Sequence, residues 1–210
     1  MKEDLVLRYS HNIVEHLGLK LYQNQPTRVI AELVSNSWDA DAEKNLINMN
    51  MDTGERWVSV FDNGHGMTRE ELLSSYLIIG HPKRVRPEEK SRGGRKLMGR
   101  KGIGKLASFG IARFVDIITI ANHDESTLAY WLRFDRDALL GHGDEDQKYR
   151  PEVICDGVKI ENIPILEDQT GQIKEFIELI IKTTGTGTAI LMSELSISKG
   201  ISKGQLLASL

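Results

Sequence analysis

The chain has 210 residues and a formal net charge of −3, with 40% hydrophobic and 27% charged residues, a balance that excludes a disordered or low-complexity chain. The single Cys155 excludes a disulfide within the chain. Acidic residues stand near the amino terminus where a signal peptide has an apolar run, and no window holds the roughly 18 apolar residues of a membrane span. We therefore expect a cytoplasmic protein with no signal peptide and no membrane partner.

The first predicted element is a helix over residues 26–41. Pro26 and Thr27 are helix start signals. Ile30, Leu33, Val34 and Ser37 then share one face at helical spacing. We expect that face to pack on the core.

Two short strands, 45–52 and 56–62, follow and read as a hairpin. Thr68 with Glu71 three residues later has the spacing of a capping box, which predicts a helix towards Ile79.

Residues 80–100 show no period and are rich in Gly, Pro, Lys and Arg, which predicts a mobile loop of the kind that often forms a lid. Beyond it we expect helices over 103–112 and 172–182, and strands over 114–120, 127–134, 152–160 and 188–195. Strands and helices in this irregular order predict an α+β fold rather than regular βαβ winding.

The segment 83–105 is strongly basic. It holds ten Lys and Arg residues against Glu88 and Glu89, a net charge of +8. A polyphosphate ligand explains this local charge, because a nucleic-acid-binding protein is more often basic over a whole face. A solvated loop and a secondary nucleic-acid role are the alternatives.

Glu32, Asn36 and Asp39 line one edge of the predicted helix. Residues four apart on a helix lie about 40° apart around its axis. Glu32 has the chemistry of a general base towards water, and the Asn36 carbonyl oxygen suits Mg²⁺. A plain solvent-facing polar edge is the alternative interpretation.

The sequence FDNGHGM places Asp62 at the carboxyl end of a strand. A carboxylate there can accept a hydrogen bond from the exocyclic amine of adenine. Gly64 and Gly66 allow close backbone approach to a flat ring and positive φ. An ordinary Asp-Asn-Gly turn is the alternative.

The sequence GRKGIGKLAS, residues 99–108, matches two fingerprints only superficially. A P-loop needs a hydroxyl where Leu106 stands, and a dinucleotide fold needs a strand directly before its first glycine. What remains is a glycine-rich segment whose backbone N–H groups and lysines, Lys101 and Lys105, suit an anion at a helix amino terminus.

These three motifs, in this order, resemble the GHKL ATPase superfamily with its Bergerat fold. Its members include DNA gyrase B, the ninety-kilodalton heat-shock chaperone, histidine kinases, MutL and the MORC proteins. The resemblance covers residues 27–195.

The resemblance implies that Glu32 activates water and that Asn36 is the Mg²⁺ ligand. It assigns Asp62 to the adenine amine, assisted by Thr188 of a later strand. The other nucleotide-binding positions that it implies are Asp39, Gly64, Gly66, Met67, Gly99, Gly102, Ile103 and Gly104. We also expect Arg100, Lys101 and Lys105 of the same segment to bind the nucleotide.

The implied fold is a two-layer α/β sandwich, with a mixed, mostly antiparallel sheet, helices on one face and a mobile ATP lid. We expect an ATP-binding domain over residues 1–198. Residues 199–210 would begin a segment leading to a further domain, because several branches complete the γ-phosphate site from a following domain.

The implied function is Mg²⁺-dependent hydrolysis of ATP to ADP and phosphate. Lid closure would drive an ATP-dependent homodimer, or a rearrangement of a larger protein and its client. Two alternatives stay open: a nucleotide-sensing module without turnover, and the catalytic domain of a histidine kinase.

Overall fold

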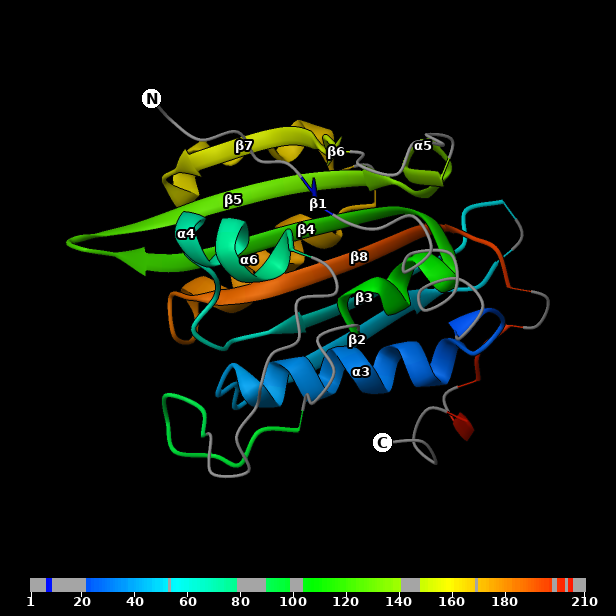
Figure 1. Ribbon diagram of the computed structural model, residues 1–210, viewed down its shortest axis with the longest axis horizontal. Coiled ribbons are helices and arrows are strands. Elements are labelled where there is room, and N and C mark those ends of the chain that lie inside the picture. The colour runs from blue at the N-terminus through cyan, green and yellow to red at the C-terminus, as the bar shows by residue number, and fades with distance from the viewer. Residues whose placement is uncertain are drawn as a thin grey trace.

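The computed structural model describes residues 7–8, 22–52, 54–78, 90–98, 104–140, 148–168, 170–197, 200–202 and 204–205. Most of them build one six-stranded sheet with helices packed against it (Figure 1). None of the helices in these ranges is both long enough and apolar enough to cross a membrane.

The sheet is antiparallel at every neighbouring pair of strands. In spatial order its strands are β2 (Asn45–Asn50), β3 (Trp57–Asp62), β8 (Gly187–Leu195), β4 (Ala112–His123), β5 (Ser126–Asp135) and β7 (Glu152–Val158). The last described strand along the chain, β8, lies between β3 and β4. A separate two-stranded pair joins β1 (Leu7–Arg8) to β6 (Lys148–Tyr149).

Helix α3 (Pro26–Asp39) covers one face of the sheet. Proline stands at its first turn, where the missing N–H costs nothing. Its buried side chains recur every three or four residues and join a core cluster with Val58 and Val60 of β3. The buried residues of this helix are Val29, Ile30, Leu33 and Ser37.

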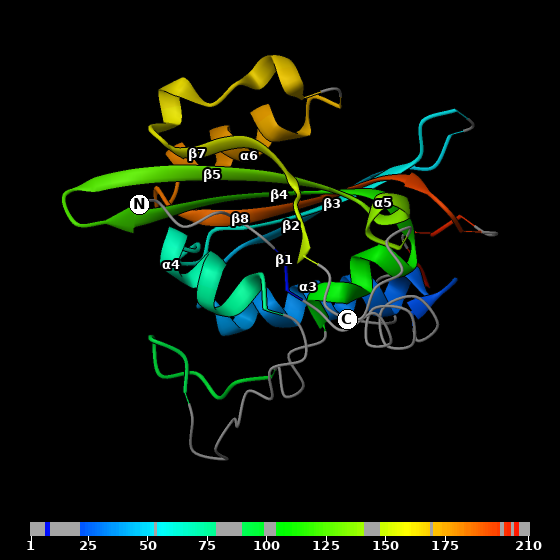
Figure 2. The same cartoon turned by 45° about the horizontal axis from the view of Figure 1, so that its top comes forward.

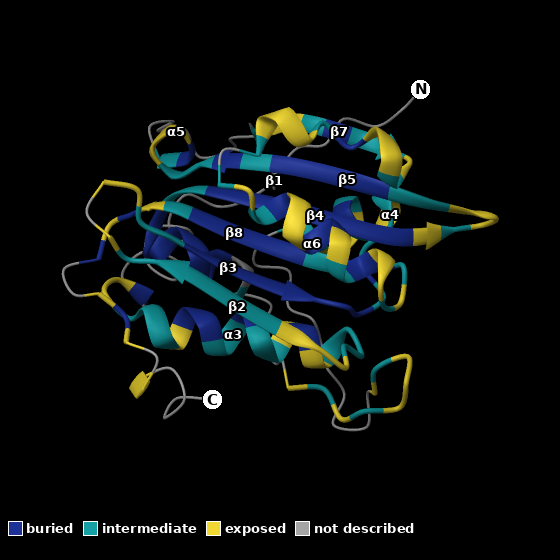
Figure 3. Ribbon diagram, turned by 180° about the vertical axis from the view of Figure 1, so that it is seen from behind, coloured by how far each residue is buried: buried dark blue, intermediate teal, exposed yellow. Residues whose placement is uncertain are grey.

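Helix α6 (Gln172–Ile181) covers the opposite face, as Figure 2 shows. Phe61 of β3 points to this side, and its ring centroid lies 5.5 Å from that of Phe176. The central strands are therefore buried on both faces, whereas exposed residues gather at the turn between β4 and β5 (Figure 3).

Short helical elements lie on both faces of the sheet. Thr68 forms the expected capping box with Glu71. The single turn of α4 (Arg69–Glu71) continues as a π-helix (Leu72–Tyr76), and a 3₁₀ helix (Gly104–Gly110) precedes β4. The others are α5 (Arg136–Leu140) and the 3₁₀ helices Ile160–Asn162 and Ile165–Glu167.

The α+β class is confirmed. The sheet, which was expected to be mixed and mostly antiparallel, is antiparallel at each described pair of strands. One detail is amended, because helices cover both faces of the sheet and not one face alone. The predicted helix over 103–112 is a 3₁₀ helix that ends before Ala112, which already pairs with Leu195 as the start of β4.

Candidate functional site

Asp62, Thr188 and Thr119 form a row across three neighbouring strands. Asp62 of β3 lies opposite Thr188 of β8, and Thr188 lies opposite Thr119 of β4. Residues directly opposite in an antiparallel pair point to the same face. Val60 of β3 faces the α3 side, so the alternating pattern puts all three polar side chains beneath α3.

The Asp62 carboxylate is almost fully buried, with 7% of the residue exposed. Its Oδ1 accepts from the backbone N–H of Gly64 at 2.9 Å and of Thr188 at 3.3 Å, and its Oδ2 accepts from the Ser37 hydroxyl at 3.0 Å. A carboxylate has about four acceptor positions, so these three donors leave room for one more. Burial raises the pKa of Asp62, although these hydrogen bonds oppose the shift.

The glycines after Asp62 sit where a side chain would collide with backbone. Gly66 has φ +65°, and a Cβ on it would lie 2.0 Å from the carbonyl oxygen of Ile120. A Cβ on Gly187 would lie 2.1 Å from the carbonyl oxygen of Asp62. The turn therefore packs directly on the backbone of β4. Of the two glycines for which a positive φ was expected, Gly66 has one and Gly64 does not.

The same turn is attached to the end of α3. A Cβ on Gly64 would lie 2.6 Å from the carbonyl oxygen of Ala40. The Asn63 side-chain oxygen accepts from the backbone N–H groups of Glu43 at 3.0 Å and Lys44 at 2.7 Å. Together with Ser37, these contacts fix α3 relative to Asp62.

Thr119 is a site residue that the sequence motifs did not reveal. Its hydroxyl oxygen accepts from the Met67 N–H at 2.7 Å and lies 3.3 Å from the Thr188 hydroxyl. The residue is fully buried. A hydroxyl among the apolar residues Ile117, Ile118 and Ile120 was the available signal, because buried hydroxyls need a partner.

The predicted polar edge of α3 exists, and its three residues have different surroundings. Glu32 is partly buried, and its Oε1 accepts from the Tyr22 hydroxyl at 3.2 Å. Asn36 is exposed. The Asp39 carboxylate accepts from the Met98 N–H at 2.7 Å.

Most of the predicted glycine-rich cradle, Gly99, Arg100, Lys101, Gly102 and Ile103, lies outside the described residues, as does the Lys105 side chain. The flanking residues are described. Met98 contacts Asp39, and Gly104 lies beside Glu32, since a Cβ on Gly104 would be 2.8 Å from Glu32 Oε2. The residue before the cradle, Met98, thus contacts Asp39 at one end of the polar edge, and the residue after it, Gly104, lies beside Glu32 at the other end.

Residues 90–98, within the predicted lid, are docked on the carboxyl end of α3. Asp41 accepts from the Ser91 hydroxyl and from the Gly93 N–H at 2.7 Å, and lies 3.9 Å from the Arg95 guanidinium. The hydrogen bond from Ser91 is the main reason that the pKa of Asp41 lies below its usual value. Further contacts are Trp38 Nε1 to the Lys96 carbonyl oxygen at 3.0 Å, Arg95 over the Trp38 ring at 4.7 Å, and an ion pair between Arg92 and Glu71.

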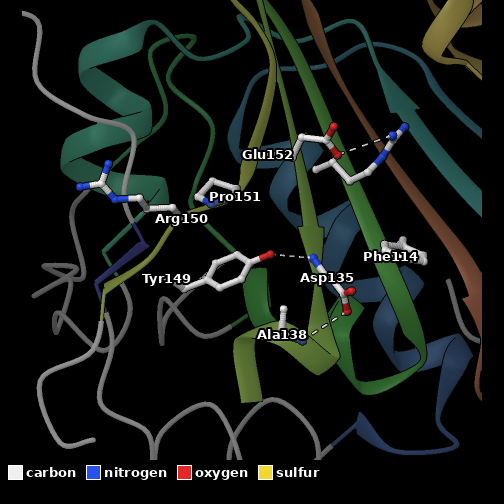
Figure 4. Close-up of a pocket in the computed structure, with 8 residues that line it drawn as sticks. Phe114, Asp135, Ala138, Tyr149, Arg150, Pro151 and Glu152 are labelled. Atoms are coloured by element: carbon white, nitrogen blue, oxygen red, sulfur yellow. Dashed lines mark hydrogen bonds and ion pairs between the residues drawn. The ribbon is translucent and has the colours of Figure 1, made fainter. Parts of the chain in front are cut away.

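A cleft of about 560 Å³ lies elsewhere, at the end of β5 beside α5 and the start of β7 (Figure 4). The Tyr149 hydroxyl there accepts from the Asp135 N–H at 2.8 Å, and Arg133 pairs with Glu152 at 3.8 Å. Phe114 lines this cleft from the start of β4, five residues before Thr119. The cleft is therefore not part of the site around Asp62.

The site combines the buried carboxylate of Asp62, a turn with two glycines and a helix edge with the carboxylate of Glu32. Within the described ranges, no group of three or more His, Cys, Asp or Glu residues could hold a metal ion. A Mg²⁺ ion here would need ligand phosphates and water beside the exposed Asn36 amide oxygen, a mode typical of Mg²⁺.

Comparison with known proteins agrees with this geometry. The sequence model of the family described as "Histidine kinase-, DNA gyrase B-, and HSP90-like ATPase" matches residues 24–163.

Three curated proteins are similar in sequence. The putative type II restriction enzyme HgiDII of Herpetosiphon aurantiacus is 42% identical over 111 residues, 53% of this chain and 17% of that protein. The ATPase morc-1 of Caenorhabditis elegans is 29% identical over 161 residues, 76% of this chain and 17% of that protein. The DNA mismatch repair protein MutL of Thermotoga maritima is 37% identical over 68 residues, 32% of this chain and 13% of that protein. The chain spans less than a fifth of each of these relatives.

Proposed function

We propose that this chain, which belongs to the family of histidine kinase-, DNA gyrase B- and HSP90-like ATPases, is a Mg²⁺-dependent module that hydrolyses ATP to ADP and phosphate. Binding and hydrolysis of ATP are the family's chemistry. The observation that carries the proposal is the attachment of Asp62 to α3 through Ser37, which joins an acceptor for adenine to the helix that bears Glu32.

Adenine recognition follows from the remaining acceptor position of Asp62. The carboxylate is already held by three donors, so it needs no rearrangement to accept the exocyclic amine. Guanine presents a carbonyl oxygen at the corresponding position, which would face a carboxylate oxygen. The site therefore favours adenine nucleotides.

Hydrolysis would use Glu32 as general base. Its carboxylate takes a proton from water while the water oxygen bonds to the γ-phosphorus, and the bond from that phosphorus to the β–γ bridging oxygen breaks to release ADP. A Mg²⁺ ion beside Asn36 would supply charge stabilisation to the phosphates. The segment 99–105 would hold the phosphates from the other side.

The chain would act within a larger protein. We propose that residues 1–198 form the ATP-binding unit and that 199–210 lead to a further domain. The short share of each relative that is matched supports a module of this kind. Closure of the lid would transmit the nucleotide state to that domain, to a client or to a second copy.

The test is phosphate release in single-turnover and steady-state experiments with Mg-ATP. Glu32→Gln should bind ATP and lose nearly all hydrolysis, whereas Glu178→Gln, an exposed change on α6, should leave it unchanged. Equal activity of the parent and Glu32→Gln would refute the assigned base. Tight binding without hydrolysis by the parent would instead indicate a sensing module, and label from γ-labelled ATP on a protein histidine would indicate a kinase.

A further inference from the structure

Tyr22 holds one oxygen of the Glu32 carboxylate. Tyr22 precedes α3, ten residues before Glu32, and its hydroxyl donates to Glu32 Oε1 at 3.2 Å. Only 5% of Tyr22 is exposed, and its ring belongs to the core cluster beneath α3. The phenol therefore approaches Glu32 from a packed and fixed position.

The phenol can act only as a donor in this contact. Burial, together with the charge of Glu32, raises the pKa of Tyr22 to about 12. Tyr22 is therefore protonated throughout the neutral range, and its proton lies on the side of Oε1.

The other oxygen of Glu32 faces the glycine-rich segment. Oε2 is the atom nearest to the position where Gly104 would carry a Cβ, at 2.8 Å. Gly104 begins the 3₁₀ helix that follows this segment. One oxygen is thus occupied by Tyr22, while the second points to where the proposed function places the phosphates.

We propose that Tyr22 is a positioning residue, which fixes the Glu32 carboxylate so that Oε2 takes the proton of the attacking water. This inference rests on the proposed function. A free glutamate side chain samples many rotamers, and a misplacement of about 1 Å can cost on the order of 100-fold in rate. Tyr22 removes that freedom without contacting the nucleotide.

The test is Tyr22→Phe, which keeps the ring and deletes only the hydroxyl. We expect kcat for Mg-ATP to fall about tenfold while KM and the affinity for ATP change less than about twofold, because among the described residues this hydroxyl donates to Glu32. In a Glu32→Gln background, the same change should have no further effect on rate, since Tyr22 acts through that carboxylate. Tyr76→Phe is the matched control, because Tyr76 packs on the same cluster, and it should retain full activity.

Three results would overturn the inference. If Glu32→Gln is inactive while Tyr22→Phe keeps the parent kcat, Tyr22 does not position the base and the proposed function stands. A rise in KM or a loss of ATP affinity in Tyr22→Phe with kcat unchanged would assign the hydroxyl to nucleotide binding and not to positioning of Glu32. Absence of hydrolysis by the parent chain would refute the proposed function, and the positioning role with it.

Discussion

Asp62 and Thr188 lie directly opposite each other on neighbouring antiparallel strands, and the Thr188 backbone N–H donates to Asp62 Oδ1 at 3.3 Å. The carboxylate proposed to bind adenine therefore belongs to a paired strand and not to a loop, and the strand pairing sets its position. This placement supplies a sharp test of nucleotide binding.

Asp62→Asn should abolish stabilisation by nucleotide and preserve the fold. An amide has nearly the shape of the carboxylate, and its oxygen can still accept from Gly64, but its NH₂ group repels the exocyclic amine of adenine. At about 100 times Kd, Mg-ATP or ADP should add about 2.7 kcal/mol to the parent's free energy of unfolding and almost nothing to the variant's. Melting curves with and without nucleotide measure this, and an equal gain in both proteins would refute the role of Asp62.

The stability difference between these two nucleotide-free proteins should depend on pH. The folded-state pKa of Asp62 is raised by burial above the unfolded value of about 3.9. Folded protein then binds the proton more tightly than unfolded chain, so the contribution of Asp62 is fully present below the unfolded pKa and is lost as pH rises through the folded pKa.

Denaturant unfolding of the parent and Asp62→Asn from pH 3 upwards checks this sign. The parent should lose stability relative to the variant as pH rises, and the difference should become constant above the folded pKa. A parent that gains stability relative to the variant over this range would show that hydrogen bonding outweighs burial at Asp62.

The parts of the site that lie within one helix or one strand were predictable from sequence. The 3.6-residue period placed Glu32, Asn36 and Asp39 on one edge of α3, and the end of an apolar run placed Asp62 at the end of β3. These inferences need only local geometry.

The remaining features depend on long-range pairing. Thr119 belongs to the site because β8, which comes late in the chain, is inserted between β3 and β4. The spacing of apolar residues within a single strand does not predict the order of strands in the sheet. The helix over 172–182 was expected, but the one-face arrangement came from the resemblance, and the strand sequence Trp57–Asp62 reads only as an almost continuous apolar run. Such a run indicates burial but does not tell which helix covers which face.

Thr119→Val should weaken ATP binding, whereas Thr119→Ser should keep it. Valine has the same shape but leaves the Met67 N–H without its acceptor, at a cost of about 1–3 kcal/mol. The turn beneath the base and the Thr188 hydroxyl would both lose their support. Titration calorimetry with Mg-ATP checks this. Equal affinities of the two variants would show that the Thr119 hydroxyl is dispensable.

Gly66→Ala should be far more destabilising than Gly185→Ala. Both glycines have a positive φ, +65° and +75°, which costs a non-glycine residue about 1–3 kcal/mol. A Cβ at Gly185 meets open space, whereas one at Gly66 would overlap the Ile120 carbonyl oxygen at 2.0 Å. Denaturant unfolding of both variants isolates this overlap, and similar losses would show that the turn can shift away from β4.

Asp41→Ala should release the docked segment 90–98 while the rest of the fold stays intact. Asp41 receives hydrogen bonds from Ser91 and Gly93, so its loss removes the main attachment of these residues to the end of α3. Segments with few remaining contacts open at low free energy. Amide hydrogen exchange at 91–98 should accelerate, while exchange in α6 stays at the parent rate. Asp137→Ala on α5, at the other end of the sheet, is the control. If amide protection of 91–98 is unchanged in Asp41→Ala, the contacts of Trp38 and Arg92 suffice to hold the segment.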